Sequence, residues 1–218
     1  TSGSAFFDGR DLLALSRREM RRLWGTEIAM IFQDPMTSLN PMVKIGRQVI
    51  EHLRQHKNVN RREAKQTALD LLNEVRIPEA ESRIDRLPHE LSGGMRQRVS
   101  IASALACEPS LLFADEPTTA LDVTVQHQIL NLLSREQRQR NMTMVMVTHD
   151  LGVIAGRTDD TLVMYAGKVV EQASTDEIFE KTQHPYTEAL MRSIPRTSQA
   201  SHTPLAAITG RPPVATHL

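Results

Sequence analysis

The sequence predicts an α/β fold, with a parallel sheet core, a helical region and a short antiparallel part at the N-terminus. After residue 110, short apolar runs alternate with helical stripes, as strands and crossover helices do in a parallel sheet. Residues 44–107 carry a sustained helical pattern, and a turn dipeptide near the N-terminus separates two short strand-like segments. With 218 residues, the chain is long enough to bury a full core.

The N-terminal part is predicted to hold two short strands around a turn, followed by a helix and a further strand. Ala5-Phe6-Phe7 precedes Asp8-Gly9, a dipeptide typical of tight hairpin turns. The segment from Leu12 to Trp24 is rich in arginine, which indicates a surface helix. Ile28 to Phe32 is a compact apolar run and therefore a strand candidate.

The next part of the chain is predicted to be helical. One amphipathic helix is indicated by apolar residues at helical spacing, namely Ala64, Ala68, Leu71, Leu72 and Val75. Pro78 and Pro88 bracket a predicted loop, and a further helix follows Ser92.

After residue 110 the pattern alternates between strand and helix. Leu111 to Ala114 and Met142 to Val147 are predicted strands, and a helix between them is indicated by the stripe Val125, Ile129, Leu132 and Leu133. Thr161 to Tyr165 and Val169-Val170 flank Ala166-Gly167, which suggests a hairpin. The tail from about residue 195 is rich in Pro, Ser and Thr and is expected to be loosely ordered.

The composition narrows the class of protein. Lys+Arg and Asp+Glu balance at 26 each, which argues against a broad nucleic-acid-binding surface. Cys107 stands alone, so the sequence offers no intrachain disulfide and no cysteine cluster for a metal. No run approaches the roughly 20 apolar residues that span a bilayer, and the N-terminus does not resemble a signal peptide. We expect an intracellular protein that reaches a membrane only through a partner.

The stretch Ser92-Gly93-Gly94 is the first candidate site. Ser92 is a good N-cap, and the glycines allow backbone N–H groups to approach a ligand closely. A helix that starts in this way offers free amides and a positive dipole end to an anion. An isolated Ser-Gly-Gly is, however, most often a plain helix cap with a flexible entry.

Polar residues follow two successive predicted strands. Asp115-Glu116 ends the first, and His149-Asp150 ends the second. Ligands bind at the carboxyl ends of strands in open α/β sheets. Asp115 could hold Mg²⁺ through water, and Glu116 could polarise a water for attack on a phosphate. An isolated acidic pair would more often be a solvated loop, but two such sites on successive strands favour a functional interpretation.

These stretches, taken together, resemble the ABC ATPase family. Five segments occur in that family's order and spacing: Gln33 after a strand, Leu91 to Met95, Leu111 to Glu116, Thr119 to Asp122, and Thr148 to Asp150. They look like the Q-loop, signature motif, Walker B motif, D-loop and H-switch. Four segments are similar in sequence to the ATPase subunits of oligopeptide, dipeptide and nickel importers. They are residues 32–41, 91–95, 115–126 and 164–167. His184-Pro185-Tyr186-Thr187 resembles the start of their C-terminal extension, and Leu205 to Pro213 its continuation.

The resemblance implies a role for each site residue. In this family two ATPase domains sandwich two ATP molecules. Gln33 would help coordinate Mg²⁺ and the attacking water, Asp115 would support Mg²⁺, and Glu116 would be the general base. His149 would contact the γ-phosphate.

Other roles implied by the resemblance involve partners. Ser92, Gly93 and Gly94 would contact the γ-phosphate held by a second ATPase subunit, identical or related. Asp122 would carry communication across that dimer. The helices between Gln33 and Ser92 would receive a coupling helix from a permease, which in turn works with a substrate-binding protein. The subunit would lie at the cytoplasmic face of the cell membrane, and no nucleic-acid partner is expected.

The resemblance divides the chain into four segments. Residues 1–40 would hold the antiparallel strands and the Q-loop, and residues 41–108 the helical subdomain that ends in the signature helix. Residues 109–182 would form the α/β core with the Walker B motif and H-switch, and residues 183–218 the C-terminal extension.

The sequence departs from the family at the phosphate-binding loop. It contains no Gly-x-x-x-x-Gly-Lys-Ser/Thr, whose amides and lysine hold the β- and γ-phosphates. The 218-residue chain is therefore expected to bind ATP poorly and to be inactive alone. The P-loop NTPase core would be incomplete, with an exposed strand edge and uncovered apolar surface.

Three functions stay open from the sequence. The first is a partial ATP-hydrolysing subunit of a peptide importer. The second is an interaction module that lends Ser92, Gly93 and Gly94 to a partner ATPase and hydrolyses nothing itself; intact Glu116 and His149 argue mildly against it. The third, an ABC ATPase outside transport such as a DNA-repair ATPase, is disfavoured by the neutral charge and the lack of coiled-coil heptads.

Overall fold

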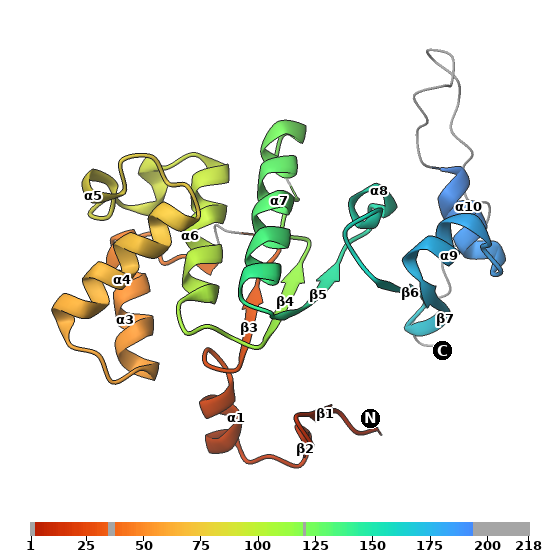
Figure 1. Ribbon diagram of the computed structural model, residues 1–218, viewed down its shortest axis with the longest axis horizontal. Coiled ribbons are helices and arrows are strands. Elements are labelled where there is room, and N and C mark those ends of the chain that lie inside the picture. Colours follow the sequence, from red (N-terminus) through yellow and green to blue (C-terminus); the bar gives the residue numbers. More distant parts are fainter. Residues whose placement is uncertain (1–2, 35–37, 120, 194–218) are drawn as a thin grey trace. The chain divides into compact units, whose positions relative to one another are not determined.

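The computed structural model describes residues 3–34, 38–119 and 121–193 (Figure 1). The chain divides into two compact units, Thr1–Val147 and Thr148–Leu218. The predicted division into four segments is a finer one and stays a prediction.

The first unit is built on a three-stranded parallel sheet. β3 (Ile28–Ile31), β4 (Leu111–Asp115) and β5 (Thr143–Val147) lie in the order β3-β4-β5. The connection from β4 to β5 runs through the long helix α7 (Val123–Gln139), as a crossover between parallel strands requires (Figure 1). The predicted α/β fold with a parallel sheet is confirmed.

A small hairpin precedes this sheet. β1 (Phe6–Phe7) and β2 (Arg10–Asp11) pair antiparallel around Asp8 and Gly9, both of which have positive φ angles. The antiparallel N-terminal part is thus confirmed.

The arginine-rich helix is shorter than predicted. α1 spans Arg17–Leu23, whereas the prediction ran from Leu12 to Trp24. The Asp11 carboxylate accepts a hydrogen bond from the Leu13 N–H, which holds the preceding segment in a turn. Ser16 and Glu19 then form a capping box that fixes the start of the helix.

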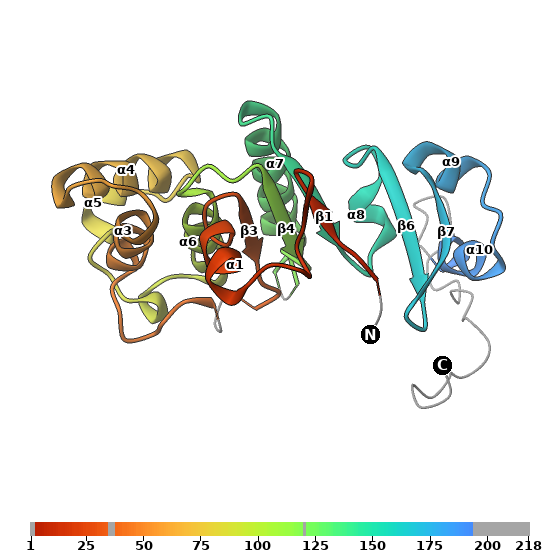
Figure 2. The ribbon, with the colours of Figure 1, turned by 90° about the horizontal axis from the view of Figure 1, so that it is seen from below.

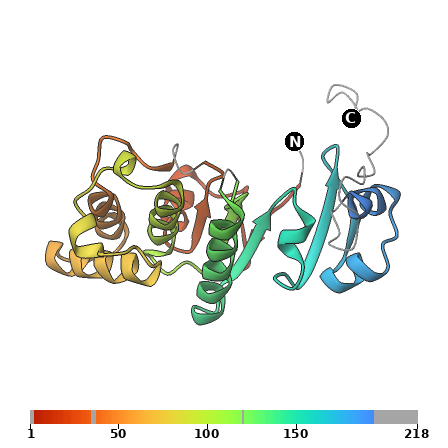
Figure 3. The same ribbon diagram turned by 90° about the horizontal axis from the view of Figure 1, so that it is seen from above.

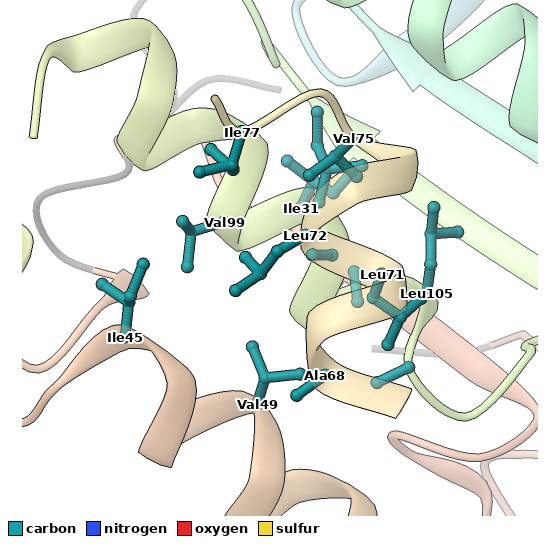
Figure 4. Close-up of a cluster of buried hydrophobic side chains, with 14 of the residues drawn as sticks. Ile31, Ile45, Val49, Ala68, Leu71, Leu72, Val75, Ile77, Val99 and Leu105 are labelled. Atoms are coloured by element: carbon teal, nitrogen blue, oxygen red, sulfur yellow. The ribbon is translucent and has the colours of Figure 1, made fainter. Parts of the chain in front are cut away.

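A helical region fills the connection from β3 to β4. Its elements are α3 (Ile45–His56), α4 (Arg61–Glu74), α5 (Ala80–Arg83), the 3-10 helix η1 (Pro88–Glu90) and α6 (Gly93–Leu105). Figures 2 and 3 show α3, α4 and α6 next to one another, beside the sheet. The predicted stripe on α4 is buried, and it packs with Ile31 of β3, Val49 of α3 and Val99 of α6 (Figure 4).

The segment between Pro78 and Pro88, predicted to be a loop, contains the helix α5. It is ordered because it caps α3: the N–H groups of Ile45 and Gly46 donate to the carbonyls of Arg86 and Ile84, at 2.9 Å each. Only glycine fits at position 46, since a β-carbon there would lie 2.0 Å from Ile84 Cγ1. This long-range contact has no signal in the local sequence.

One strand of the sheet is left partly uncovered. Among the described residues β5 pairs with β4 alone and forms one of the two edges of the sheet. Val145 and Val147 on β5 are 41% and 50% exposed. Parallel sheets are normally covered on both faces, so this edge agrees with the exposed strand edge and uncovered apolar surface expected from the sequence.

The described part of the second unit, up to residue 193, holds a hairpin and three helices. β6 (Asp160–Tyr165) and β7 (Lys168–Ser174) pair antiparallel around Ala166 and Gly167, as predicted. The helices are α8 (Leu151–Ile154), α9 (Thr175–Glu180) and α10 (Pro185–Arg192). The predicted continuation Leu205 to Pro213 and the tail from residue 195 lie outside the described residues.

The segment His184-Pro185-Tyr186 docks α10 onto this hairpin. His184 caps the helix by accepting the Tyr186 N–H, and the Tyr186 ring lies 4.5 Å from that of Tyr165, centroid to centroid. The Glu171 carboxylate on β7 accepts the N–H groups of Gln183 and His184 at 2.7 and 3.2 Å. The pKa of Glu171 lies below its ordinary value. Burial alone would raise this pKa, but the hydrogen bonds to the carboxylate, including these two, have the larger effect.

Candidate functional site

The carboxyl ends of β3 and β4 bring two predicted site residues together. Gln33 follows β3 and Glu116 follows β4, 83 positions apart in the sequence, and Gln33 Nε2 donates a hydrogen bond of 2.6 Å to Glu116 Oε2. The contact arises because parallel neighbours end at the same edge of a sheet. The structure thus places an amide and a carboxylate side by side where α/β sheets bind ligands.

Glu116 is held in a defined position. The Thr119 hydroxyl donates to Glu116 Oε2 at 2.7 Å, and the Glu116 N–H donates to the Val147 carbonyl at 2.9 Å. Its φ of 43° is uncommon for a residue other than glycine, and such backbone strain concentrates at functional sites. No role of its own was predicted for the Thr119 hydroxyl from the sequence. A hydroxyl three residues after a strand-ending carboxylate is the signal that could have suggested one.

Asp115 is the last residue of β4 and is half-buried, with Val147 of β5 as its register partner. The described residues contain no group of three or more His, Cys, Asp or Glu side chains that could hold a metal. Mg²⁺ is commonly bound by one or two carboxylates together with substrate phosphates and water. The Asp115 carboxylate and the Gln33 amide oxygen are oxygen ligands of the kind that Mg²⁺ prefers. Substrate phosphates and water would supply the other ligands.

The signature segment starts helix α6. Ser92 is its N-cap, and the Ser92 hydroxyl accepts the Met95 N–H at 3.3 Å. A β-carbon at Gly94 would lie 2.6 Å from Val125 Cγ1 on α7, whereas one at Gly93 would meet only Leu121 Cδ2 at 3.7 Å. Close packing of α6 on α7 therefore explains Gly94 by itself. The fold makes no such demand at Gly93.

Asp122 caps α7 next to this segment. The Asp122 carboxylate accepts the Val125 N–H at 2.9 Å. Because Gly93 faces Leu121 and Gly94 faces Val125, the first turns of α6 and α7 lie side by side. Ala120, in the predicted D-loop, lies outside the described residues.

His149 belongs to the second unit and is exposed. The Thr148 hydroxyl accepts the Asp150 N–H at 3.0 Å, and Asp150 caps α8 by accepting the Gly152 N–H at 2.8 Å. The catalytic role of His149 stays a prediction, as do the roles of the other site residues.

The first unit also contains a pocket of about 570 Å³ between β3, α3 and α6. Its wall includes Phe32, directly before Gln33, and the half-exposed Trp24. Its lining is completed by Gly25, Ala29, Met30, Ser38, Leu39, Gln48, His52, Ser100, Ser103 and Ala104.

A cluster of ion pairs around one buried carboxylate joins the helical region to α7. Glu136 on α7 is fully buried and accepts hydrogen bonds from Arg135 at 2.6 Å and Arg140 at 3.1 Å. Arg140 also pairs with Glu74 at the end of α4, at 2.7 Å. The pKa of Glu136 lies below its ordinary value. Burial alone would raise this pKa, but the hydrogen bonds to the carboxylate have the larger effect.

Comparison with known sequences identifies the family. The sequence pattern described as "ABC transporter" matches residues 1–119, more than half of the chain. The chain belongs to the ABC transporter family. The pattern "Oligopeptide/dipeptide transporter, C-terminal region" matches residues 170–218 of this ABC transporter chain. The family predicted from the five motifs is confirmed.

Within the family the chain groups with peptide transport ATP-binding proteins. It is 51% identical over 211 residues to the oligopeptide transport ATP-binding protein OppD of Bacillus subtilis, covering 97% of this chain and 59% of OppD. It is 53% identical over 193 residues to the dipeptide transport ATP-binding protein DppD of Escherichia coli, covering 88% and 59%. The OppD of Haemophilus influenzae is 50% identical over 216 residues, covering 99% and 67%. The chain spans about three fifths of the length of the first two relatives.

Solved structures agree. A dimeric, post-hydrolysis structure of the ATP-binding cassette MJ0796, bound to ADP and Pi, matches with a TM-score of 0.72 and 28% identity, covering 80% of this chain and 74% of that one. CbiO1 from Clostridium perfringens, part of the ABC transporter complex cbiONQ, matches with a TM-score of 0.71 and 30% identity, covering 84% and 70%. These matches confirm the ABC ATPase fold.

Proposed function

We propose that this chain is the larger part of an ATP-binding and ATP-hydrolysing subunit of an ABC importer for peptides. The observation that carries the proposal is the hydrogen bond between Gln33 and Glu116 at the carboxyl ends of β3 and β4. It joins two residues whose sequence contexts resemble the Q-loop and the end of the Walker B motif. The peptide transport relatives support the cargo class.

In this proposal Glu116 is the general base. Its carboxylate accepts a proton from the water that attacks the terminal phosphate of ATP, and Gln33 and Thr119 orient it. Asp115 and Gln33 would hold Mg²⁺, which, when bound, neutralises charge on the phosphates. His149 would contact the γ-phosphate.

The first turns of α6 and α7 would serve a second ATPase subunit. Ser92, Gly93 and Gly94 would contact the γ-phosphate held by that partner, through the N–H groups at the start of α6. Asp122, at the adjacent start of α7, would transmit the state of one site to the other. The side-by-side packing of the two helix starts supports a joint role.

The pocket beside the Q-loop would receive a permease helix. Trp24 and Phe32 line it and are 40% and 51% exposed, which suits an apolar partner. Phe32 adjoins Gln33, and Gln33 is hydrogen-bonded to Glu116. A permease helix that binds in the pocket would therefore change the position of Glu116 through Gln33. No helix in the described part of the chain is long and apolar enough to cross a bilayer. The peptide transport relatives support peripheral attachment at the cytoplasmic face of the membrane, with a substrate-binding protein acting through the permease.

The experiment starts with the coding sequence upstream of Thr1. If it adds Gly-x-x-x-x-Gly-Lys-Ser/Thr in frame, the longer protein should hydrolyse ATP, and Glu116→Gln should lower turnover by about 100-fold or more. Glu108→Gln, at an exposed carboxylate in the same unit, is the matched control. Unchanged turnover in Glu116→Gln would refute the role of Glu116. The 218-residue chain alone should bind ATP poorly, and micromolar affinity would contradict that expectation.

The second candidate is a module that lends its signature segment to a partner ATPase. The absence of a structural demand for glycine at position 93 favours a ligand there. Mixing the chain with a partner subunit that carries a phosphate-binding loop tests this. Ser92→Arg should abolish the partner's ATPase activity in this case, while Glu116→Gln should leave it unchanged.

A further inference from the structure

Two histidines one helical turn apart converge on the turn before β3. His52 and His56 lie at positions i and i+4 on α3, so their side chains leave the same face of the helix. Their ring centroids are 4.9 Å apart. A β-carbon at Gly25 would lie 3.0 Å from His52 Cε1 and 3.0 Å from His56 Nε2. The edges of both rings therefore meet at one point above Gly25.

One ring nitrogen of this pair is buried and unsatisfied. His52 Nε2 is inaccessible to solvent and has no hydrogen-bond partner among the described residues. Such an atom calls for an explanation, because buried polar groups are nearly always paired. Burial lowers the pKa of His52 and the neighbouring His56 lowers it further, whereas a hydrogen bond between the His52 ring and the Gly25 backbone raises it by a smaller amount. A neutral imidazole offers the lone pair that a metal ion needs.

We propose that His52 and His56 form a two-nitrogen site for a divalent transition-metal ion such as Cu²⁺, Ni²⁺ or Zn²⁺. Histidines four positions apart on a helix are a recurrent pair of metal ligands. Imidazole nitrogen suits these ions, whereas Mg²⁺ and Ca²⁺ prefer oxygen. No third His, Cys, Asp or Glu joins the pair within the described ranges, so the protein supplies two ligands. The site lies apart from Glu116 and does not depend on the proposed ATPase function.

The site also predicts a consequence for the pocket. His56 is the last residue of α3, and His52 lines the pocket together with Trp24 and Gly25. A metal ion bound by both rings ties the last turn of α3 into a chelate next to the wall of the pocket. Occupancy of the site thus stiffens one side of the surface proposed to receive the permease.

The single tryptophan of the chain reports on this site. Trp24 adjoins Gly25 and lines the same pocket, and the sequence contains no other tryptophan. The tag-free 218-residue chain is titrated with CuCl₂ while Trp24 emission is followed, since Cu²⁺ quenches nearby tryptophan and binds imidazole most tightly in its series. We expect saturable quenching that EDTA reverses and that Zn²⁺, which does not quench, competes away.

Substitutions decide the outcome. His52→Gln and His56→Ala should each weaken Cu²⁺ binding by about 100-fold, because each leaves one ligand instead of a chelate. His89→Ala, at an exposed histidine on η1, is the control and should leave the curve unchanged. Quenching that does not saturate, or that survives both substitutions, overturns the proposal. His56→Ala keeps the test valid if His52→Gln disturbs the pocket, since His56 is only half-buried and ends its helix.

Discussion

Two adjacent glycines in the signature segment should differ in how their substitution by alanine changes the stability of the fold. Neither Gly93 nor Gly94 has a positive φ, so alanine is allowed at both by the backbone. In a helix, alanine gains up to about 1 kcal/mol over glycine. At Gly94 the new β-carbon would lie 2.6 Å from Val125 Cγ1, and over-packing of this kind costs about 1–3 kcal/mol. Val125 cannot easily turn away because β-branched residues in helices have one strongly preferred rotamer.

We therefore expect Gly94→Ala to lower the free energy of unfolding by about 1–2 kcal/mol and Gly93→Ala to leave it equal or slightly higher. Urea unfolding followed by Trp24 fluorescence measures both in the first unit. In the double variant Gly94→Ala/Val125→Ala the clash is gone, so its stability should match that of Val125→Ala alone or exceed it slightly. Equal stability of the two glycine variants, or no recovery in the double variant, would refute the close approach of α6 and α7.

Two carboxylates give further predictions. Glu136→Ala should lower the free energy of unfolding by about 3 kcal/mol in the same urea titration, because it removes the buried carboxylate that pairs with Arg135. Glu51→Ala, which breaks an exposed ion pair, should lower it by at most about 0.5 kcal/mol. Equal losses would contradict this. Glu171→Gln should speed hydrogen exchange at the Gln183 N–H at pH 7, unlike Glu180→Gln. The lowered pKa of Glu171 means that its stabilising effect is complete above the ordinary value of 4.5 and fades below it, so wild type and Glu171→Gln should converge in acid.

Much of the fold could be predicted from local signals. The stripe on α4 and the apolar runs of β3, β4 and β5 were predicted correctly, because the spacing of apolar residues within each segment indicates its secondary structure. Two local predictions were wrong. The helix predicted from Leu12 begins only at Arg17, because the Asp11 side chain holds the backbone of Leu13 in a turn and Ser16 caps the helix through the Glu19 N–H. The predicted loop after Pro78 contains α5, because it caps a helix more than thirty residues earlier.

The sequence by itself determined the family, since the motifs around Gln33, Ser92 and Glu116 can be recognised from their order and their residues without a structure. Only the tertiary structure decided which contacts these residues make. The pairing of β3 with β4 sets Gln33 against Glu116, and the approach of α7 gives Gly94 a packing role that Gly93 lacks. The physical reason is that such contacts join segments far apart in the sequence, whereas local propensity and periodicity carry information about neighbouring residues alone.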